Sequence, residues 1–214
     1  MSPTREQLES ARDRLLPDVV RSGLRVLFSG INPGLVSAWT GHHFARPGNR
    51  FWPALHRSGF TPRQLRPDEQ EELLGLGLGV TNVVPRATAR ADELTREELL
   101  AGGNTLRAKV VALEPGWLAV VGVTAYRTAF GEPRAVVGPQ DERIGATRGV
   151  GAAEPERAQR PLHAGRAGRG VRPAPRRDNL TEAANLCGPW CVSTRERVLT
   201  GVTGASRRTR FLTS

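Results

Sequence analysis

The strongest constraint on the fold is a series of short apolar runs that alternate with helical patterns. The runs are LRVLFSG (24–30), GVTNVV (79–84), WLAVVG (117–122) and the more polar RIGATRGV (143–150). Short, continuously apolar runs are typical of strands buried on both faces of a parallel sheet. The alternation predicts an α/β fold, a three-layer sandwich whose central parallel sheet of four strands is flanked by helices. Ligands of such sheets bind at the carboxyl ends of the strands.

Helices are expected between these runs. Segment 5–16 has an amphipathic spacing that Pro17 ends, and 68–77 is a short acidic helix. Segment 95–115 is a longer helix, with Thr95 and Glu98 in capping-box spacing and two glycines, Gly102 and Gly103, that weaken its middle. A further helix is expected over VTAYRTAFG, which ends at Gly131.

The stretch 30–49 is rich in Gly and Pro and predicts a long loop, which leads into a helix that starts near Pro47. Long loops in compact domains are usually functional. His42 and His43 lie in this loop, and we expect both at its surface, because no acidic partner or metal ligand is apparent beside them.

The composition changes near residue 149. Residues 1–148 hold 19 Lys and Arg against 16 Asp and Glu, whereas residues 149–214 hold 12 against 5. The second part is rich in Arg, Gly, Ala and Pro and has no hydrophobic period. We therefore predict one folded domain over 1–148 and an unpatterned basic tail over 149–214 that forms no stable packed structure. The excess of basic residues indicates a polyanionic partner, although most of it lies in the tail.

Cofactor and membrane functions are not expected. Cys187 and Cys191 are the only cysteines, and a lone C-x₃-C pair lacks the ligands of a zinc site, so we predict no metal and no cofactor. No apolar run approaches the roughly 20 residues that cross a bilayer, and the N-terminus has no apolar core of a secretory signal. Few cysteines fit a reducing cytosol, so we expect a cytoplasmic protein.

The sharpest local motif is GINPG, Gly30 to Gly34, directly after the first predicted strand. Pro33 restricts Asn32 to an extended backbone, which holds the Asn32 amide at the carboxyl end of that strand. An asparagine is no general base, but its carbonyl accepts a hydrogen bond and orients a water molecule. Taken alone, the motif also fits a turn whose Asn only satisfies backbone groups.

Longer segments carry a resemblance to a known family. VLFSGINPGLVSAWTGHHFARPGNRFW (26–52) resembles the first motif region of the mismatch-specific uracil/thymine DNA glycosylases, which belong to the uracil-DNA glycosylase superfamily. Three further segments follow in the expected order and spacing: GVTNVVPRAT (79–88), LRAKVVALEPGWLAVVG (106–122) and AYRTAFG (125–131). The resemblance covers about 125 residues.

This resemblance implies roles for individual residues. Asn32 aligns with the asparagine that positions the attacking water, and Phe44 matches the aromatic residue that stacks on the flipped base. Ser37 and Asn82 match pocket positions that contact the base. The backbone around Ile31 contributes to the same pocket, which includes Gly30, Pro33 and Gly34 as substrate-binding positions. Three residues, Arg46, Asn49 and Arg50, are expected to contact DNA.

The implied reaction is hydrolysis of the N-glycosidic bond of uracil, with thymine as a second candidate, opposite guanine. The expected partner is double-stranded DNA that carries a G·U or G·T mismatch, bound by a monomer. Loop 30–50 contains no Asp or Glu, so an asparagine in place of an acid predicts a slow enzyme. An alternative function from another class is a non-catalytic basic protein that binds nucleic acid with the same fold.

The family also has a second motif, similar to LPNPSG, with a wedge loop and a helix after it, and no such motif can be read in residues 145–214. Residues Gly149 to Ala164, GVGAAEPERAQRPLHA, admit codons that give GWVLPNPSGLNAHYT when reading starts one base later. Continuing to Arg177 gives PAALAAAYARLRA, which has the pattern of an amphipathic helix. We therefore predict a reading-frame shift near residues 146–149.

Overall fold

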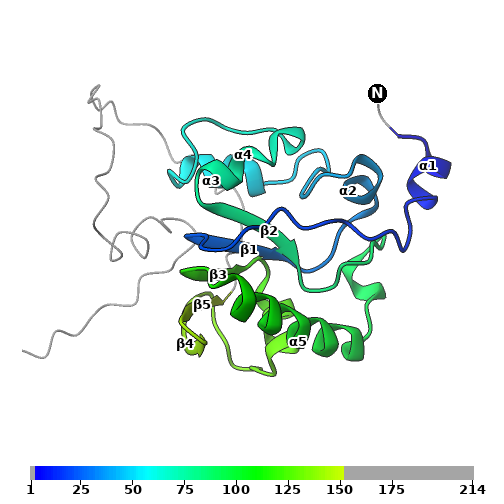
Figure 1. Ribbon diagram of the computed structural model, residues 1–214. Helices are drawn as coiled ribbons and strands as arrows, with labels where there is room; N and C mark the ends of the chain where they lie inside the picture. Colours follow the sequence, from blue (N-terminus) through cyan, green and yellow to red (C-terminus); the bar gives the residue numbers. More distant parts are fainter. Residues whose placement is uncertain (1–2, 152–214) are drawn as a thin grey trace, which may run out of the picture.

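The computed structural model describes residues 3–151, which form a five-stranded sheet with helices on both faces (Figure 1). The strand order is β2-β1-β3-β5-β4. Four of these strands are parallel to one another: β1 (Val26–Gly30), β2 (Leu78–Asn82), β3 (Trp117–Val120) and β5 (Thr147–Gly151). The predicted α/β sandwich around a parallel sheet is confirmed, and β4 (Gly138–Ile144) adds an antiparallel edge strand that the sequence did not predict.

The last predicted strand, 143–150, is wrong in its bounds. β4 ends at Ile144, Gly145 takes a left-handed conformation with φ of 60°, and β5 begins at Thr147. The two strands form a hairpin, because Gly145 permits the tight reversal that a residue with a side chain resists. The Thr147 hydroxyl donates a hydrogen bond to the Pro115 carbonyl over 2.7 Å, which ties the start of β5 to the loop before β3.

The helices match the expected order with different bounds. They are α1 (Arg5–Glu9), α2 (Leu35–Thr40), α3 (Phe51–Arg57), α4 (Glu72–Gly75), α5 (Arg96–Leu113) and α6 (Val123–Phe130), with short 3₁₀ turns at Pro67–Glu69 and Ala91–Glu93. The stretch 30–49 is not entirely loop, because α2 lies inside it, and the helix expected near Pro47 begins only at Phe51. Pro53 lies in the first turn of α3, where its missing N–H costs no hydrogen bond.

The N-terminal helix is much shorter than the predicted 5–16. After α1 the chain passes through a turn that ends at Asp13, whose N–H donates to the Ala87 carbonyl. It then runs beside β2, where Val19 exchanges two backbone hydrogen bonds with Val80. These contacts with a segment 60 or more residues later compete with the helix, and a local amphipathic pattern does not reveal them.

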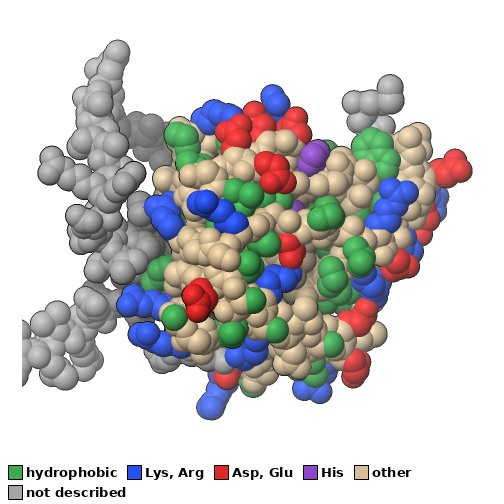
Figure 2. Space-filling model, in the orientation of Figure 1, with side chains coloured by type: hydrophobic (Ala, Val, Ile, Leu, Met, Phe, Trp, Pro, Cys, Tyr) green, Lys and Arg blue, Asp and Glu red, His purple; other side chains and the backbone are tan. Residues whose placement is uncertain are grey.

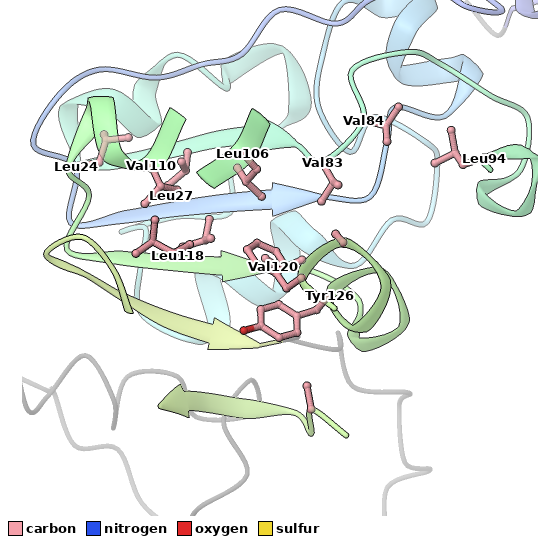
Figure 3. Close-up of a cluster of buried hydrophobic side chains, with 14 residues drawn as sticks. Leu24, Leu27, Val83, Val84, Leu94, Leu106, Val110, Leu118, Val120 and Tyr126 are labelled. Carbon is pink, nitrogen blue, oxygen red and sulfur yellow. The ribbon is translucent and has the colours of Figure 1, made fainter. Parts of the chain in front are cut away.

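The sheet separates two apolar clusters. On one face, side chains of β1 and β2 pack against Phe51, Trp52 and Leu55 of α3 and Leu73 of α4. On the other face, Leu27, Leu118 and Val120 pack against α5 and α6 (Figure 3). The faces alternate along each strand because successive side chains of a strand point to opposite sides.

Helix α5 is continuous through Gly102 and Gly103, which we had expected to weaken it. A Cβ on Gly103 would lie 2.0 Å from the Ala129 carbonyl oxygen, and one on Gly102 would lie 2.5 Å from the Val83 carbonyl oxygen. The two glycines therefore allow α5 to approach α6 and the end of β2 closely, which compensates for their low helix propensity. Among the described residues, no helix is long and apolar enough to cross a membrane.

Candidate active site

The GINPG motif is joined by backbone hydrogen bonds to the segment that follows β2. The Val83 and Val84 N–H groups donate to the carbonyls of Gly30 and Ile31, each over 2.9 Å, and the Thr88 N–H donates to the Pro33 carbonyl over 3.1 Å. Since β1 and β2 are parallel neighbours, these contacts extend their pairing beyond the carboxyl ends of both strands. The motif is therefore held rigidly at the edge of the sheet where ligands of α/β folds bind.

The Asn32 amide is fixed by two acceptors on this neighbouring segment. Its Nδ2 donates to the Thr88 hydroxyl oxygen over 2.7 Å and to the Arg86 carbonyl over 3.2 Å. The buried Thr88 hydroxyl in turn donates to the Arg90 carbonyl over 2.7 Å, so that its oxygen faces Asn32 as an acceptor. Both Asn32 N–H groups are thus used by the protein, while the amide oxygen of this half-exposed residue keeps its capacity to accept.

Asn82, the last residue of β2, is held differently. Its Nδ2 lies 3.4 Å from Nδ1 of His43, whose Nε2 lies 2.9 Å from the Pro17 carbonyl. A carbonyl only accepts, so Nε2 of His43 carries the proton and Nδ1 accepts from Asn82. Burial lowers the pKa of His43, which keeps the ring neutral and preserves this arrangement.

The predicted surface position of His43 is therefore wrong, because the side chain is only 1% exposed. Its backbone is equally fixed. The His43 N–H donates to Oε1 of Gln70 over 2.7 Å, and its carbonyl accepts from the Trp52 indole N–H over 3.2 Å. The partner on Pro17 lies 26 positions earlier in the chain. No local pattern in loop 30–49 indicates such a partner.

Gly30 brings Phe44 and Asn82 together. A Cβ at this position would lie 2.6 Å from Oδ1 of Asn82 and 3.3 Å from the Phe44 ring. Phe44 has a left-handed backbone with φ of 54°, and its ring stacks on Phe51 at 4.0 Å between centroids. A non-glycine residue in this region is strained and persists only where its surroundings enforce it. The structure thus directs an aromatic ring and an amide to the same glycine.

An ion-pair network holds the segment that binds Asn32. The Arg86 guanidinium pairs with Glu98 at the start of α5 and with Asp13, at 2.9 Å between Arg86 Nη1 and Asp13 Oδ1. The hydrogen bond from Arg86, aided by the Thr95 N–H, lowers the pKa of Glu98 to about 2. The Arg86 carbonyl also accepts from Asn32. The ion pairs that hold Arg86 in place therefore help to fix the position of the Asn32 amide.

This arrangement agrees with what comparison with known protein families gives. The model of the Uracil DNA glycosylase superfamily matches residues 17–177. The chain belongs to this superfamily. Its members are DNA N-glycosylases, hydrolases of DNA repair that cleave the bond between base and sugar. Such an enzyme must take the base out of the duplex before it reaches the sugar carbon. A uracil DNA glycosylase therefore needs a site that an extruded base can reach, and the loop at the carboxyl ends of β1 and β2 is the candidate.

The remaining predicted site residues lie on or near the same loop. Buried Ser37 accepts the Ala45 N–H with its hydroxyl oxygen over 3.1 Å, which closes the loop after α2. Oδ1 of Asn49 accepts the Phe51 N–H over 2.9 Å at the start of α3. Arg46 and Arg50 are exposed beside it. The contacts of these residues with substrate or DNA stay predictions.

Sequence reasoning missed Thr88, Arg86 and Gln70 as parts of this site. Thr88 and Arg86 stand in the quoted segment 79–88, yet their partner Asn32 lies more than 50 positions earlier.

Figure 2 shows Lys and Arg scattered among Asp and Glu on the displayed face. Within residues 3–151 no cluster of three or more His, Cys, Asp or Glu could hold a metal ion. Residues 149–151, the start of the predicted tail, belong to β5 and pair with β3, so the predicted boundary at 148 is too early. The rest of the tail and the second motif lie outside the described residues.

Proposed function

We propose that this uracil DNA glycosylase is mismatch-specific and releases uracil opposite guanine, with thymine as a second candidate substrate. The proposed partner is double-stranded DNA with a G·U or G·T mismatch, and the enzyme acts as a cytoplasmic monomer. The observation that carries the proposal is the Asn32 amide. Its two N–H groups are bound by Arg86 and Thr88, which leaves the oxygen to orient a water molecule.

The proposed chemistry needs no carboxylate. Cleavage of the bond between C1′ and the base nitrogen leaves an oxocarbenium-like sugar, and a positioned water attacks it. Uracil departs as an anion with the electron pair of that bond, and hydrogen bonds to its carbonyls stabilise this anion. The attacking water adds to C1′ and loses its proton to the departing uracil or to solvent. Loop 30–50 has no Asp or Glu. The Asn32 oxygen orients the water but does not take up its proton, so a slow reaction is expected.

Two further residues support base recognition. The stacked Phe44 offers the flipped base an aromatic surface, a contact that contributes about 1–3 kcal/mol. Asn82 offers a donor and an acceptor to the Watson–Crick edge of a pyrimidine. Extruding a base costs a few kcal/mol, and the cost is smallest where the base is mismatched. Slow chemistry and a flipping cost together favour mismatches over paired DNA.

We further propose that the glycosylase domain continues through β5 and that the frame shifts near residues 146–149. β5 is parallel to β3 and ends at Gly151. A motif read from Gly149 in the other frame would therefore leave the sheet at the same edge as Asn32. The shifted frame supplies LPNPSG and a helix, and ends a glycosylase of about 175 residues. In its present frame the 214-residue chain is expected to be inactive.

The test compares two chains on four duplexes. The 214-residue chain and its one-base-corrected counterpart are incubated in excess over duplexes with G·U, G·T, A·U and G·C pairs. We expect uracil release from G·U by the corrected chain and faster release there than from A·U. DNA binding without release by both chains would contradict the proposal and favour the non-catalytic alternative. Gene sequence around codons 143–180 that holds no LPNPSG frame would contradict the frame shift alone.

A further inference from the structure

We propose that His43 is a specificity-determining positioning residue: it fixes which end of the Asn82 amide faces the base, so that the site accepts a uracil edge and rejects a cytosine edge. This inference rests on the proposed function, because it concerns how the same site chooses its base. His43 itself is buried behind Asn82 and touches no base.

The geometry begins at the Pro17 carbonyl, a backbone acceptor that cannot change its role. It lies 2.9 Å from Nε2 of His43 and requires a proton there. A neutral ring then has its lone pair on Nδ1, 3.4 Å from Nδ2 of Asn82. The Pro17 carbonyl thus makes Nε2 of His43 a donor and Nδ1 an acceptor, and Nδ1 in turn requires the nitrogen end of the Asn82 amide.

Burial makes the arrangement resistant to inversion. His43 is 1% exposed and Asn82 is 7% exposed, so water does not replace either partner freely. If the Asn82 amide turned over, its oxygen would face the lone pair of Nδ1, and a donor and an acceptor would both lose their partners. Leaving a buried polar group unpaired costs about 1–3 kcal/mol.

The fixed amide reads the base through the order of donor and acceptor. Uracil presents an acceptor at position 4 and a donor at position 3, and cytosine presents the reverse order. One orientation of an amide complements uracil, and the opposite orientation complements cytosine. Because His43 permits only one orientation, binding cytosine requires the costly inversion, whereas uracil binds the amide as it stands.

Gly30 provides space for the oxygen end of the Asn82 amide. Its missing side chain leaves space for Oδ1 of Asn82, which lies 2.6 Å from where a Cβ would stand. Phe44 approaches the same point. The amide oxygen is therefore directed toward Gly30, which the ring proposed to hold the base also approaches, while the nitrogen end is directed toward His43.

The first experiment needs no activity. Long-range nitrogen–proton NMR spectra of the full 214-residue chain report the tautomer of its four histidines, and His43→Asn and His43→Gln assign the His43 signals. We expect a proton on Nε2 and none on Nδ1 at neutral pH. A proton on Nδ1 would overturn the proposal, because Nδ1 could then not accept from Asn82.

The second experiment measures base choice. Duplexes carry 2′-fluoro-deoxyuridine or 2′-fluoro-deoxycytidine opposite guanine, since the fluorine disfavours the oxocarbenium-like state and prevents cleavage. The ratio of their two dissociation constants is compared between parent and variants of the corrected chain. The flipping cost belongs to the duplex and cancels in this comparison.

Two variants separate the roles of the two ring nitrogens. His43→Asn keeps an acceptor near the place of Nδ1, and we expect it to retain most of the preference for uracil. His43→Gln reaches the Pro17 carbonyl but offers no acceptor to Asn82, and we expect its preference to fall about tenfold. Equal preference in parent and His43→Gln would overturn the proposal. If the parent itself shows no preference for uracil, the proposed function fails, and the NMR result still decides the tautomer.

Discussion

The ends of β1 and β2 present the same side chain in two different settings. Asn32, two residues beyond β1, is half-exposed, and acceptors on the neighbouring segment hold its nitrogen. Asn82, the last residue of β2, is buried, and the lone pair of a histidine holds its nitrogen. In both cases the protein binds the nitrogen end of the amide, through both N–H groups of Asn32 and through one N–H group of Asn82.

The difference lies in what surrounds each oxygen. Asn32 is half-exposed, whereas Asn82 is buried and its oxygen lies toward Gly30, which the ring of Phe44 also approaches. The two amides have the same donor and acceptor groups. They differ in solvent exposure and in the partner that holds the nitrogen. Under the proposed function, we therefore expect Asn32 to affect the rate of cleavage and Asn82 to affect the choice of base.

The largest expected effect is that of Asn32→Ala. We expect single-turnover uracil release by the corrected chain to fall at least ~10²-fold, because the attacking water loses its orientation. Binding to a G·U duplex should change little. Activity equal to that of the parent would remove Asn32 from the mechanism.

The next effect is that of Gly30→Ala. The added methyl group would lie 2.6 Å from Oδ1 of Asn82, so the amide must move away from Phe44. We expect uracil release to fall at least about tenfold, since small displacements in a site are costly. Gly75→Ala in α4 is the matched control, because a Cβ there meets no atom within 4 Å and Gly75 lies outside the proposed site. Equal losses in both variants would mean a general disturbance of the domain.

A smaller effect is expected from Thr88→Val, which keeps the shape of the side chain and removes its hydroxyl. Asn32 then loses its 2.7 Å acceptor and retains only the Arg86 carbonyl. Losing this hydrogen bond should raise the activation free energy by about 1 kcal/mol, which lowers the rate of uracil release roughly fivefold. Thr88→Ser should restore the rate, and its failure to do so would assign the loss to packing.

The smallest effect concerns acid stability. The folded chain lowers the pKa of Glu98 from its ordinary value of 4.5 to about 2, so the unfolded chain takes up this proton first. The stabilising contribution is present above pH 4.5 and is lost as the pH falls toward 2. Urea denaturation should show that Glu98→Gln flattens this part of the pH profile. Exposed Glu97→Gln is the control, and the same flattening there would refute the assignment.

The sequence predicts the strands and the residues at their ends, because the apolar runs are local. Asn32 could be placed at the carboxyl end of its strand for this reason, whereas Asn82 lay inside the predicted strand 79–84 and was selected only by the family resemblance. The hydrogen-bond partners of the two amides could not be predicted. Thr88 reaches Asn32, and His43 reaches Asn82, only when segments far apart in the chain pack together. Helix 5–16 was overestimated for the same reason, since the chain from Asp13 to Val19 pairs with the segment 80–87.

The most direct test measures rate and affinity separately for both asparagines. Asn32→Ala and Asn82→Ala are made in the corrected chain, and each is assayed for single-turnover release from G·U. Each is also assayed for its affinity for the 2′-fluoro-deoxyuridine duplex. We predict that Asn32→Ala lowers the rate constant and leaves the affinity nearly unchanged, whereas Asn82→Ala weakens the affinity about tenfold through lost hydrogen bonds to the base. If both variants alter the same quantity to the same extent, the proposed division between the two amides is wrong.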